Sequence, residues 1–429
     1  MFEVHAPGFF HLKGGLIPKE NILHYTCQSE QQSKNMKRNT IAILSLAAIL
    51  GYACEGPSEN KPEKWSVRMA NTVIKRNPEL ITYNNPKSVK WQYDIAMVGH
   101  AVDRVGNGDT FYSAYMKAFY DYFVQDDGTI RLYAPESYNL DHVNPAKGLI
   151  TLYKRTGEEK YLKGIKQIIN QLENQPRISE GGFWHKKIYP WQMWLDGLYM
   201  SSPFMAEYAH EFNEPAWLDS TAKQITLVYE KTLDPQTGLL YHAYDESRQQ
   251  AWCDPETGKS KEFWGRAMGW YMMALVDALD FFPEDHPRRQ EIIDILNKVS
   301  EALMKVRDPE AKVWYQVLDK GGREGNYLEG SCSAMFTYAF AKGARKGYLP
   351  SEYLDIARES FEGMLKTFIV EEEDGTLTMK NICGAAGLGG NPYRDGTYEY
   401  YVNEIRVDND PKGVGPFIFA ALELEQIDK

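Results

Sequence analysis

Apolar residues recur at helical spacing in about twelve segments that follow one another from Trp65 to the C-terminus. Alternation of apolar and polar residues, the pattern of a half-buried strand, is weak in comparison. The pattern therefore predicts an all-α protein. Its helices are expected to begin near Trp65, Tyr93, Phe111, Pro145, Tyr161, Met193, Trp217, Trp264, Arg289, Leu328, Tyr353 and Val414.

The connections between these segments alternate between two types. Short polar turns such as "RVGNGDTFY" and "KRTGEEKYL" are typical of links between antiparallel neighbours. Long connections such as "DDGTIRLYAPESYNLDHVNPA" carry extended apolar stretches and many of the aromatic and charged residues. Because the two types alternate, short and long loops must lie at opposite ends of the helix array. A helical hairpin repeated at roughly 50 to 70 residues indicates stacked helix pairs.

Six such pairs form either an open solenoid or a closed ring. An open solenoid needs polar capping repeats and regular units, whereas the long loops here differ greatly from one another. We therefore predict an (α/α)6 barrel that spans residues 65–429. All long loops would then surround one mouth, and loops held on a rigid scaffold are where binding and catalytic residues are usually placed.

A separate segment precedes the expected barrel. Lys37 and Arg38 lead into the apolar stretch 41–50, which is too short to cross a membrane, and small residues follow up to Cys54. This pattern predicts a lipoprotein-type export signal at 36–54, with Cys54 as the lipidated residue. Residues 1–35 are then interpreted as a misassigned upstream segment and residues 55–64 as a linker. The alternative is a cytosolic chain with an amphipathic leader.

An exported lipoprotein would place the protein in the periplasm or at the surface of a bacterium. The net charge of -11 disfavours nucleic acid and anionic lipid as partners, so the expected membrane contact is the lipid anchor alone. The five cysteines show neither zinc-site spacing nor a disulfide framework, and no nucleotide or metal motif occurs. We expect no metal and no cofactor. Cys27 and Cys54 fall in the leader region, and we interpret the other three cysteines as isolated thiols: Cys253, Cys332 and Cys383.

The stretch "FWHKKIYPWQMWLDGLYM" places one carboxylate, Asp196, among Trp191, Trp194 and Tyr199. A carboxyl group that must carry a proton at neutral pH benefits from such apolar surroundings, and sugars bind to flat aromatic faces. Alternatively, the stretch is a helix start at which Asp196 favours the N-terminal dipole and the aromatic rings belong to the core.

Five further polar or aromatic residues fall in the same phase of the repeat. Asp141 and Lys186 occupy successive long connections, and His242 lies in the next one. Arg266 and Trp270, four residues apart on the following helix, would share one face, where a guanidinium can grip a carboxylate and an indole can cover a sugar ring. A cation–π pair in the core and a structural histidine are the alternatives.

The segments "FWHKKIYPWQMWLDGLYM", "FWGRAMGWY", "YLEGSCSAMF" and "YEYY…DNDPKGVGPF" resemble glycoside hydrolase family 105, the unsaturated rhamnogalacturonyl hydrolases, which are related to unsaturated glucuronyl hydrolases. The resemblance covers residue 65 to the C-terminus. It implies an (α/α)6 barrel that removes a terminal 4,5-unsaturated uronic acid from fragments of pectin such as rhamnogalacturonan. It also implies that Asp196 is the general acid and base. The positions that match the family's substrate-contacting residues are Tyr93, Asp141, Lys186, His242, Arg266 and Trp270.

The implied reaction protonates C4 of the C4=C5 enol ether and adds water at C5, so one carboxyl group can first give and later take a proton. It does not need the two carboxylates of ordinary glycosidases. Lys186 would oppose a protonated Asp196 if its ammonium group came within ~4–6 Å. Two other functions stay open: an inverting glycosidase with Asp141 as base and Asp196 as acid, and a glycan-binding surface lipoprotein without turnover.

Overall fold

The computed structural model describes residues 63–83 and 89–427. Residues 1–62 lie outside the described residues, and with them the expected export segment, nearly all of the linker, Cys27 and Cys54. No helix in the two described ranges is both long enough and apolar enough to span a bilayer.

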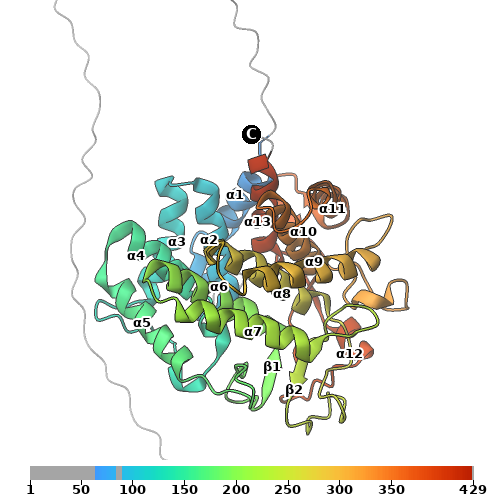
Figure 1. The fold of residues 1–429 in the computed structure, drawn as a ribbon. Coiled ribbons are helices and arrows are strands. Elements are labelled where there is room, and N and C mark those ends of the chain that lie inside the picture. The colour runs from blue at the N-terminus through green and yellow to red at the C-terminus, as the bar shows by residue number, and fades with distance from the viewer. Residues whose placement is uncertain (1–62, 84–88, 428–429) are drawn as a thin grey trace, which may run out of the picture. The chain divides into compact units, whose positions relative to one another are not determined.

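Within the described residues, twelve long helices form two concentric rings (Figure 1). The inner ring consists of α2 (Tyr93–Gly106), α4 (Ala146–Thr156), α6 (Leu195–Glu211), α8 (Gly265–Ala278), α10 (Gly330–Arg345) and α13 (Pro411–Ile427). The outer ring consists of α1 (Trp65–Arg76), α3 (Thr110–Phe123), α5 (Glu159–Glu173), α7 (Ala216–Thr232), α9 (Arg289–Lys305) and α11 (Glu352–Phe368). Each outer helix packs on an inner one, and the first and last helices, α1 and α13, lie side by side.

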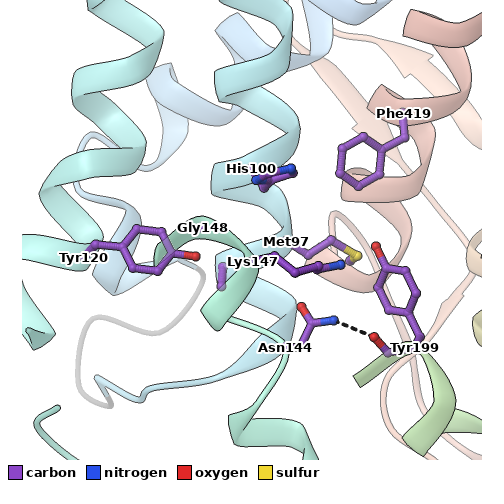
Figure 2. Close-up of a pocket in the computed structure, with 9 residues that line it drawn as sticks. Met97, His100, Tyr120, Asn144, Lys147, Gly148, Tyr199 and Phe419 are labelled. Atoms are coloured by element: carbon purple, nitrogen blue, oxygen red, sulfur yellow. Dashed lines mark hydrogen bonds between the residues drawn. The ribbon is translucent and has the colours of Figure 1, made fainter. Parts of the chain in front are cut away.

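The inner helices contact one another in the order α2, α13, α10, α8, α6 and α4. Figure 2 shows how the ring closes between α4 and α2: His100 of α2, Lys147 of α4, Tyr199 of α6 and Phe419 of α13 line one small cavity. The side-chain amide of Asn144, just before α4, donates to the backbone oxygen of Tyr199 at 3.0 Å. The closed ring of six helix pairs confirms the predicted (α/α)6 barrel.

The two rings differ in sequence because they differ in what surrounds them. On α9 the buried residues, from Ile292 to Leu303, recur every three or four positions and form one apolar stripe. On α8 nearly every side chain is buried, as expected of a helix enclosed on all sides. Gly269 lets α8 approach α10 closely, since a Cβ at this position would lie 2.6 Å from the sulfur of Met335.

All twelve predicted segments contain a helix, and the observed helices begin within three residues of the expected positions. The periodicity did not reveal the six-residue helix α12 (Tyr398–Asn403) or the 3-10 turns η1 (Leu80–Thr82), η2 (Pro135–Ser137), η3 (Leu140–His142), η4 (Leu279–Phe281) and η5 (Leu318–Lys320). These elements are too short to show a period. They lie mostly in the connections, where local contacts decide the backbone path.

The long connections lead into the N-terminal ends of inner helices, as in 124–145 and 233–264, and the short ones, such as 107–109 and 157–158, leave their C-terminal ends. Long and short loops therefore occupy opposite ends of the barrel, as predicted. We call them the long-loop end and the short-loop end.

Three two-stranded antiparallel sheets stiffen the long-loop end. They pair β1 (Gln192–Trp194) with β2 (Ala243–Asp245), β3 (Ile369–Glu371) with β4 (Leu377–Met379), and β5 (Ile382–Cys383) with β6 (Arg406–Val407). The β1–β2 pair joins two different long connections, so it fixes their positions relative to each other. Trp194 lies opposite Ala243 in this ladder.

Candidate active site

The β1–β2 ladder places Asp196 beside His242. At its end the backbone N–H of Leu195 donates to the carbonyl oxygen of His242 at 3.1 Å, and Asp196 follows directly in the first turn of α6. Oδ2 of Asp196 lies 3.1 Å from Nε2 of His242, although the approach lacks the alignment of a full hydrogen bond. Two residues from separate connections thus become one carboxylate–imidazole pair.

Aromatic rings enclose this pair on the histidine side. The centroid of the His242 ring lies 4.7 Å from that of Trp264 and 5.3 Å from that of Trp194. His242 is fully buried, whereas 16% of the Asp196 side chain is exposed although its Oδ2 is buried, so Asp196 is the member of the pair that solvent reaches. Asp196 also lies at the positive end of the α6 dipole. The interpretation of this stretch as a helix start is therefore compatible with its interpretation as part of a site.

The other two aromatic residues of the "WQMWLDGLY" stretch lie elsewhere. Trp191, 44% exposed, packs its ring edge-on against Trp184 at 4.9 Å. Tyr199, one turn further along α6, points toward the barrel axis and stacks on Trp270 at 5.1 Å. The rings of Trp194 and Trp264 contact His242 of the pair, whereas the ring contacts of Trp191 and Tyr199 are with Trp184 and Trp270 instead.

A second charged pair lies next to the first. The backbone N–H of Leu140 donates to the carbonyl oxygen of His185 at 3.1 Å, which brings η3 against the segment before β1. Asp141 of η3 then lies 2.5 Å from the ammonium group of Lys186. Burial is the largest single influence and would raise the pKa of Asp141, but Lys186, His185 and His142 together outweigh it and the net shift is downward. Lys186 is therefore engaged by Asp141.

His185 connects the two pairs, and the sequence analysis did not single it out. Its Nε2 is 3.6 Å from Oδ1 of Asp141, and its ring stacks on Trp194 at 4.7 Å. Burial lowers the pKa of His185 to about 4, and Asp141 and Asp196 act in the opposite direction. The imidazole is therefore neutral at pH 7. Its position next to Lys186 in "FWHKK" was the available signal.

Arg266 lies in the first turn of α8 and is almost completely buried. One terminal nitrogen, Nη2, donates to the carbonyl oxygen of Cys383, and the guanidinium carbon lies 5.3 Å from the ring centroid of Trp264. Its Nε and Nη1 have no hydrogen-bond partner among the described residues. Buried donors without an acceptor are costly, so these two positions suit an anionic ligand.

Trp270 occupies a different place from the one expected. Its side chain is fully buried, with the ring stacked on Tyr199 and edge-on to Tyr93 at 5.8 Å. The expected clamp of Arg266 and Trp270 is therefore not formed by direct contact, because Trp264 takes the position beside the guanidinium group. Trp270 supports the ring of Tyr93 from beneath.

Tyr93 begins α2 and is half-buried. Its pKa is raised well above the ordinary value, chiefly by burial and then by Asp94 and Asp141, while Arg266 acts in the opposite direction. The phenol therefore lies close to charged groups of three elements: α2, η3 and α8. Together with the Asp196–His242 pair and the Asp141–Lys186 pair, it defines a candidate active site at the long-loop end.

A hollow of about 340 Å³ borders Asp141 on the side of α2. It is lined by Val89, Lys90, Trp91, Gln92, Leu132, Asn139, Asp141 and His142. The mixture of polar side chains and one exposed apolar side chain, Leu132, suits an oligosaccharide better than a purely apolar ligand.

The cysteines of the described part are free and buried, at positions 253, 332 and 383. This confirms the prediction of isolated thiols for these three. Within the same part of the chain, no three His, Cys, Asp or Glu side chains come together in a way that could hold a metal ion.

Comparison with known proteins gives three relevant findings. The sequence model of Glycosyl Hydrolase Family 88 matches residues 65–427. A solved structure of a family 105 glycoside hydrolase from C. acetobutylicum ATCC 824 is 45% identical, with a TM-score of 0.82, over 85% of this chain and 100% of that chain. More distant structures include an unsaturated glucuronyl hydrolase specific for heparin, at 15% identity and a TM-score of 0.63, which supports the fold alone.

Two curated proteins are also similar. Protein Atu3128 of Agrobacterium fabrum is 40% identical over 230 residues, which is 52% of this chain and 97% of that protein. The unsaturated rhamnogalacturonyl hydrolase YesR of Bacillus subtilis is 28% identical over 269 residues, 60% of this chain and 72% of that protein.

Proposed function

The chain belongs to Glycosyl Hydrolase Family 88, and from this premise we propose that it removes a terminal 4,5-unsaturated uronic acid from oligosaccharides left by a polysaccharide lyase. It is a glycoside hydrolase, and its family 105 relative covers nearly the whole barrel. The reaction that we propose is protonation and hydration of the C4=C5 enol ether. It needs one group that first gives a proton and later takes one back. It also needs a cation for the carboxylate of the uronate.

The observation that carries the proposal is the unequal state of the two carboxylates. Asp141 is held by Lys186 at 2.5 Å and by His185 at 3.6 Å, so its proton affinity is low. Asp196 is free of a lysine or arginine partner among the described residues and has only the imidazole of His242 beside it. One carboxyl group is therefore available for proton transfer, which is the number that enol-ether hydration needs.

In the proposed mechanism Asp196 gives a proton to C4, and positive charge develops at C5 next to the ring oxygen. Water then adds to C5 and returns a proton to Asp196. The product is a hemiketal, which opens and releases the remaining sugar. General acid–base catalysis of this kind typically contributes about 10²- to 10⁴-fold.

Arg266 is the proposed site for the carboxylate of the uronate. Its Nε and Nη1 are buried and have no hydrogen-bond partner among the described residues, so this cation keeps donors unused that an anion could accept from. The carbonyl oxygen of Cys383 accepts a hydrogen bond from Nη2 and keeps the guanidinium group in place. Lys186, His242, Tyr93 and Asp141 would contact the sugar, while Trp270 acts from beneath Tyr93.

The substrate class follows from the most informative relative. YesR is an unsaturated rhamnogalacturonyl hydrolase, so we propose fragments of rhamnogalacturonan, a pectin, as the first substrates to test. The hollow beside Asp141 would receive the sugars beyond the cleaved bond. Unsaturated glucuronides are the second class.

The proposal is tested with lyase-generated disaccharides of several polysaccharides. Turnover is followed as loss of the ultraviolet absorbance of the conjugated uronate. In deuterium oxide, deuterium should appear at C4 of the released keto acid when the product is sampled early. In water labelled with heavy oxygen, the label should enter at C5. Attack at the anomeric carbon would leave C4 without deuterium, and that result would reject the mechanism.

An inverting glycosidase with Asp141 as base is the second enzymatic function. It would need Asp141 to take a proton from water, which the ammonium group at 2.5 Å opposes. Activity on saturated glycosides would favour it. Tight binding of glycans without turnover would favour the third function, a surface binding protein.

We also propose that the chain is exported as a periplasmic or surface lipoprotein of a bacterium. The support is the sequence 36–54, with its two basic residues, short apolar stretch and Cys54. Labelling with a radioactive fatty acid tests it. The wild-type chain should carry the label and Cys54→Ala should lose it, whereas an unlabelled wild-type chain would contradict the proposal.

A further inference from the structure

Behind the Asp196–His242 pair lies a buried tyrosine that contacts the far side of the imidazole. The hydroxyl group of Tyr401, from helix α12, lies 2.7 Å from Nδ1 of His242. Both side chains are fully buried. The two residues are 159 positions apart in the sequence, so this contact exists only in the folded barrel.

Tyr401 is held firmly in this position. Its ring stacks on Trp264 with centroids 5.8 Å apart, and its backbone oxygen accepts a hydrogen bond from Nε2 of Gln316 at 3.0 Å. Oε1 of the same glutamine accepts from Nε1 of Trp264 at 3.1 Å. The tyrosine, the tryptophan that covers His242 and the glutamine therefore form one rigid unit.

The Tyr401 hydroxyl group is the donor of this hydrogen bond, and Nδ1 of His242 is its acceptor. Burial, together with Tyr400 and Asp196, raises the pKa of Tyr401 well above its ordinary value, so the phenol keeps its proton. Among the described residues, Nδ1 of His242 is the one hydrogen-bond partner of this hydroxyl group. A buried O–H without an acceptor would leave its desolvation uncompensated. The hydroxyl group therefore donates, and Nδ1 accepts.

The opposite edge of the ring is compatible with this direction. If Nδ1 accepts, the proton of a neutral imidazole is on Nε2, which lies 3.1 Å from Oδ2 of Asp196. In the other tautomer a lone pair of Nε2 would face the lone pairs of Oδ2, both when Asp196 is ionised and when its proton is on Oδ1. Catalytic contacts are often poorly aligned before substrate binds, so the imperfect angle of this contact is not an obstacle.

We propose that Tyr401 is a positioning residue for the hydrolase reaction: by donating to Nδ1 it fixes His242 as the Nε2–H tautomer, which engages Oδ2 of Asp196 and reserves Oδ1 for the substrate. This inference rests on the proposed function for its catalytic consequence, while the tautomer itself does not depend on the substrate.

The two proton transfers then balance on a single oxygen. The proton on Oδ1 passes to C4, and the resulting carboxylate keeps the Nε2–H donor at Oδ2. When water adds to C5, its proton passes to Oδ1 and restores the acid. The imidazole takes up no proton in either transfer, and the phenol does not exchange its proton in the cycle.

The first test is Tyr401→Phe, which removes one oxygen and keeps the ring. We expect kcat to fall about tenfold to a hundredfold, part of what general acid catalysis contributes, while KM changes less than about threefold. Tyr400→Phe is the matched control, since that neighbouring hydroxyl accepts a hydrogen bond from the backbone N–H of Gly387 at 3.0 Å and has no contact with His242. A kcat of Tyr401→Phe equal to that of Tyr400→Phe would overturn the inference.

The second test reads the tautomer directly and needs no turnover. In protein labelled with ¹⁵N-histidine, the imidazole nitrogens of His242, identified by their loss in His242→Gln, should show a protonated Nε2 and an unprotonated Nδ1 at neutral pH. Tyr401→Phe should move the proton toward Nδ1, and Tyr400→Phe should not. A protonated Nδ1 in the wild-type protein would overturn the inference even if Tyr401→Phe failed to fold.

The two measurements separate this inference from the proposed function. If unsaturated uronides are not hydrolysed but the Nε2–H tautomer is found, the proposed function fails and the assignment of the hydrogen bond stands. If the substrates are hydrolysed and Nδ1 carries the proton, the function stands and the role of Tyr401 is rejected.

Discussion

At the short-loop end of the barrel, buried charges are matched by opposite charges. Lys342 near the end of α10 has its ammonium nitrogen 2.7 Å from a carboxylate oxygen of both Asp277 and Asp280. Glu423 of α13, fully buried, accepts from Arg104 at 3.1 Å and from Arg345 at 2.5 Å. Arg104, Asp277, Asp280 and Lys342 line a cavity of about 300 Å³ and use their hydrogen bonds on these partners, while Nδ1 of His100 in the same lining has none.

At the long-loop end, several buried groups lack such partners. Arg266 keeps two donors unused, and Oδ2 of Asp196 and Nε2 of His242 approach each other without a full hydrogen bond. Unpaired polar groups in a protein interior cost free energy, and they persist where a ligand or a reaction uses them. The contrast teaches that buried charge alone does not distinguish the two ends of this barrel. The unused donors of a buried arginine do, and they occur beside the candidate active site.

The comparison predicts that mutations at the long-loop end reduce activity, whereas mutations at the short-loop end change stability. The largest effect should come from Asp196→Asn. The amide keeps the shape of the carboxyl group but cannot deliver a proton, so turnover should fall by about 10²- to 10⁴-fold or more. Unfolding in denaturant should stay close to that of the wild-type protein. A rate near the wild-type value would remove Asp196 from the chemistry.

The next largest effect should come from Lys342→Met at the short-loop end. Removing one partner of a buried ion pair leaves an uncompensated charge, so the free energy of unfolding should fall by about 3–5 kcal/mol. The KM and kcat of the protein that remains folded should be unchanged.

Lys346→Met is the control for that experiment. Lys346 contacts the same Asp280 at 3.2 Å from a more exposed position, and such a pair contributes about 0–1 kcal/mol. If both variants unfold at the wild-type denaturant concentration, the charges at this end do not stabilise the barrel as the comparison requires.

Arg266→Lys should have an intermediate effect. A point charge replaces the planar guanidinium group that we propose binds the uronate carboxylate, so KM should rise about tenfold to a hundredfold while kcat falls less. Arg104→Lys at the short-loop end makes the same chemical change beside Glu423, and it should leave KM unchanged. A collapsed kcat with an unchanged KM in Arg266→Lys would instead place Arg266 in the chemical step.

The smallest effect concerns Glu207 of α6, which lines the cavity at the short-loop end. Burial raises its pKa to about 7, and Lys147 acts in the opposite direction. Between the unfolded pKa of about 4.5 and about 7, the folded state keeps a proton that the unfolded state has lost, so this group lowers the stability as pH rises. Glu207→Gln should remove the loss, with a melting temperature about 2 °C or more above wild type at pH 8 and no gain at pH 4.

Glu301→Gln, on the exposed face of α9, controls for the general effect of removing a carboxylate. A melting temperature of Glu207→Gln that follows the wild-type value at every pH would show that Glu207 carries no such penalty.

The sequence predicted the barrel because each helix is long enough to show its period. The starts of α2 at Tyr93 and α9 at Arg289 match the expected positions, and the alternation of loop lengths correctly placed Asp141, Lys186 and Asp196 at one end. Long-range partners carry no such local signal. Tyr401 meets His242 across 159 residues, and Trp264 rather than Trp270 faces Arg266 because the backbone enters α8 at an angle that spacing alone does not specify.

The β1–β2 ladder ties the connection between α7 and α8 to the segment that leads into α6. The backbone N–H of Asp245, the last residue of β2, donates to the carbonyl of Gly258, and that of Ser260 donates to Ala243, so residues 246–257 form an excursion closed at its base. Trp252 and Cys253 of this excursion pack with Trp194 and Ala243 in one buried cluster. The excursion is therefore a buttress for the strand that leads to Asp196, and loop exchange should be confined to its exposed residues 254–257.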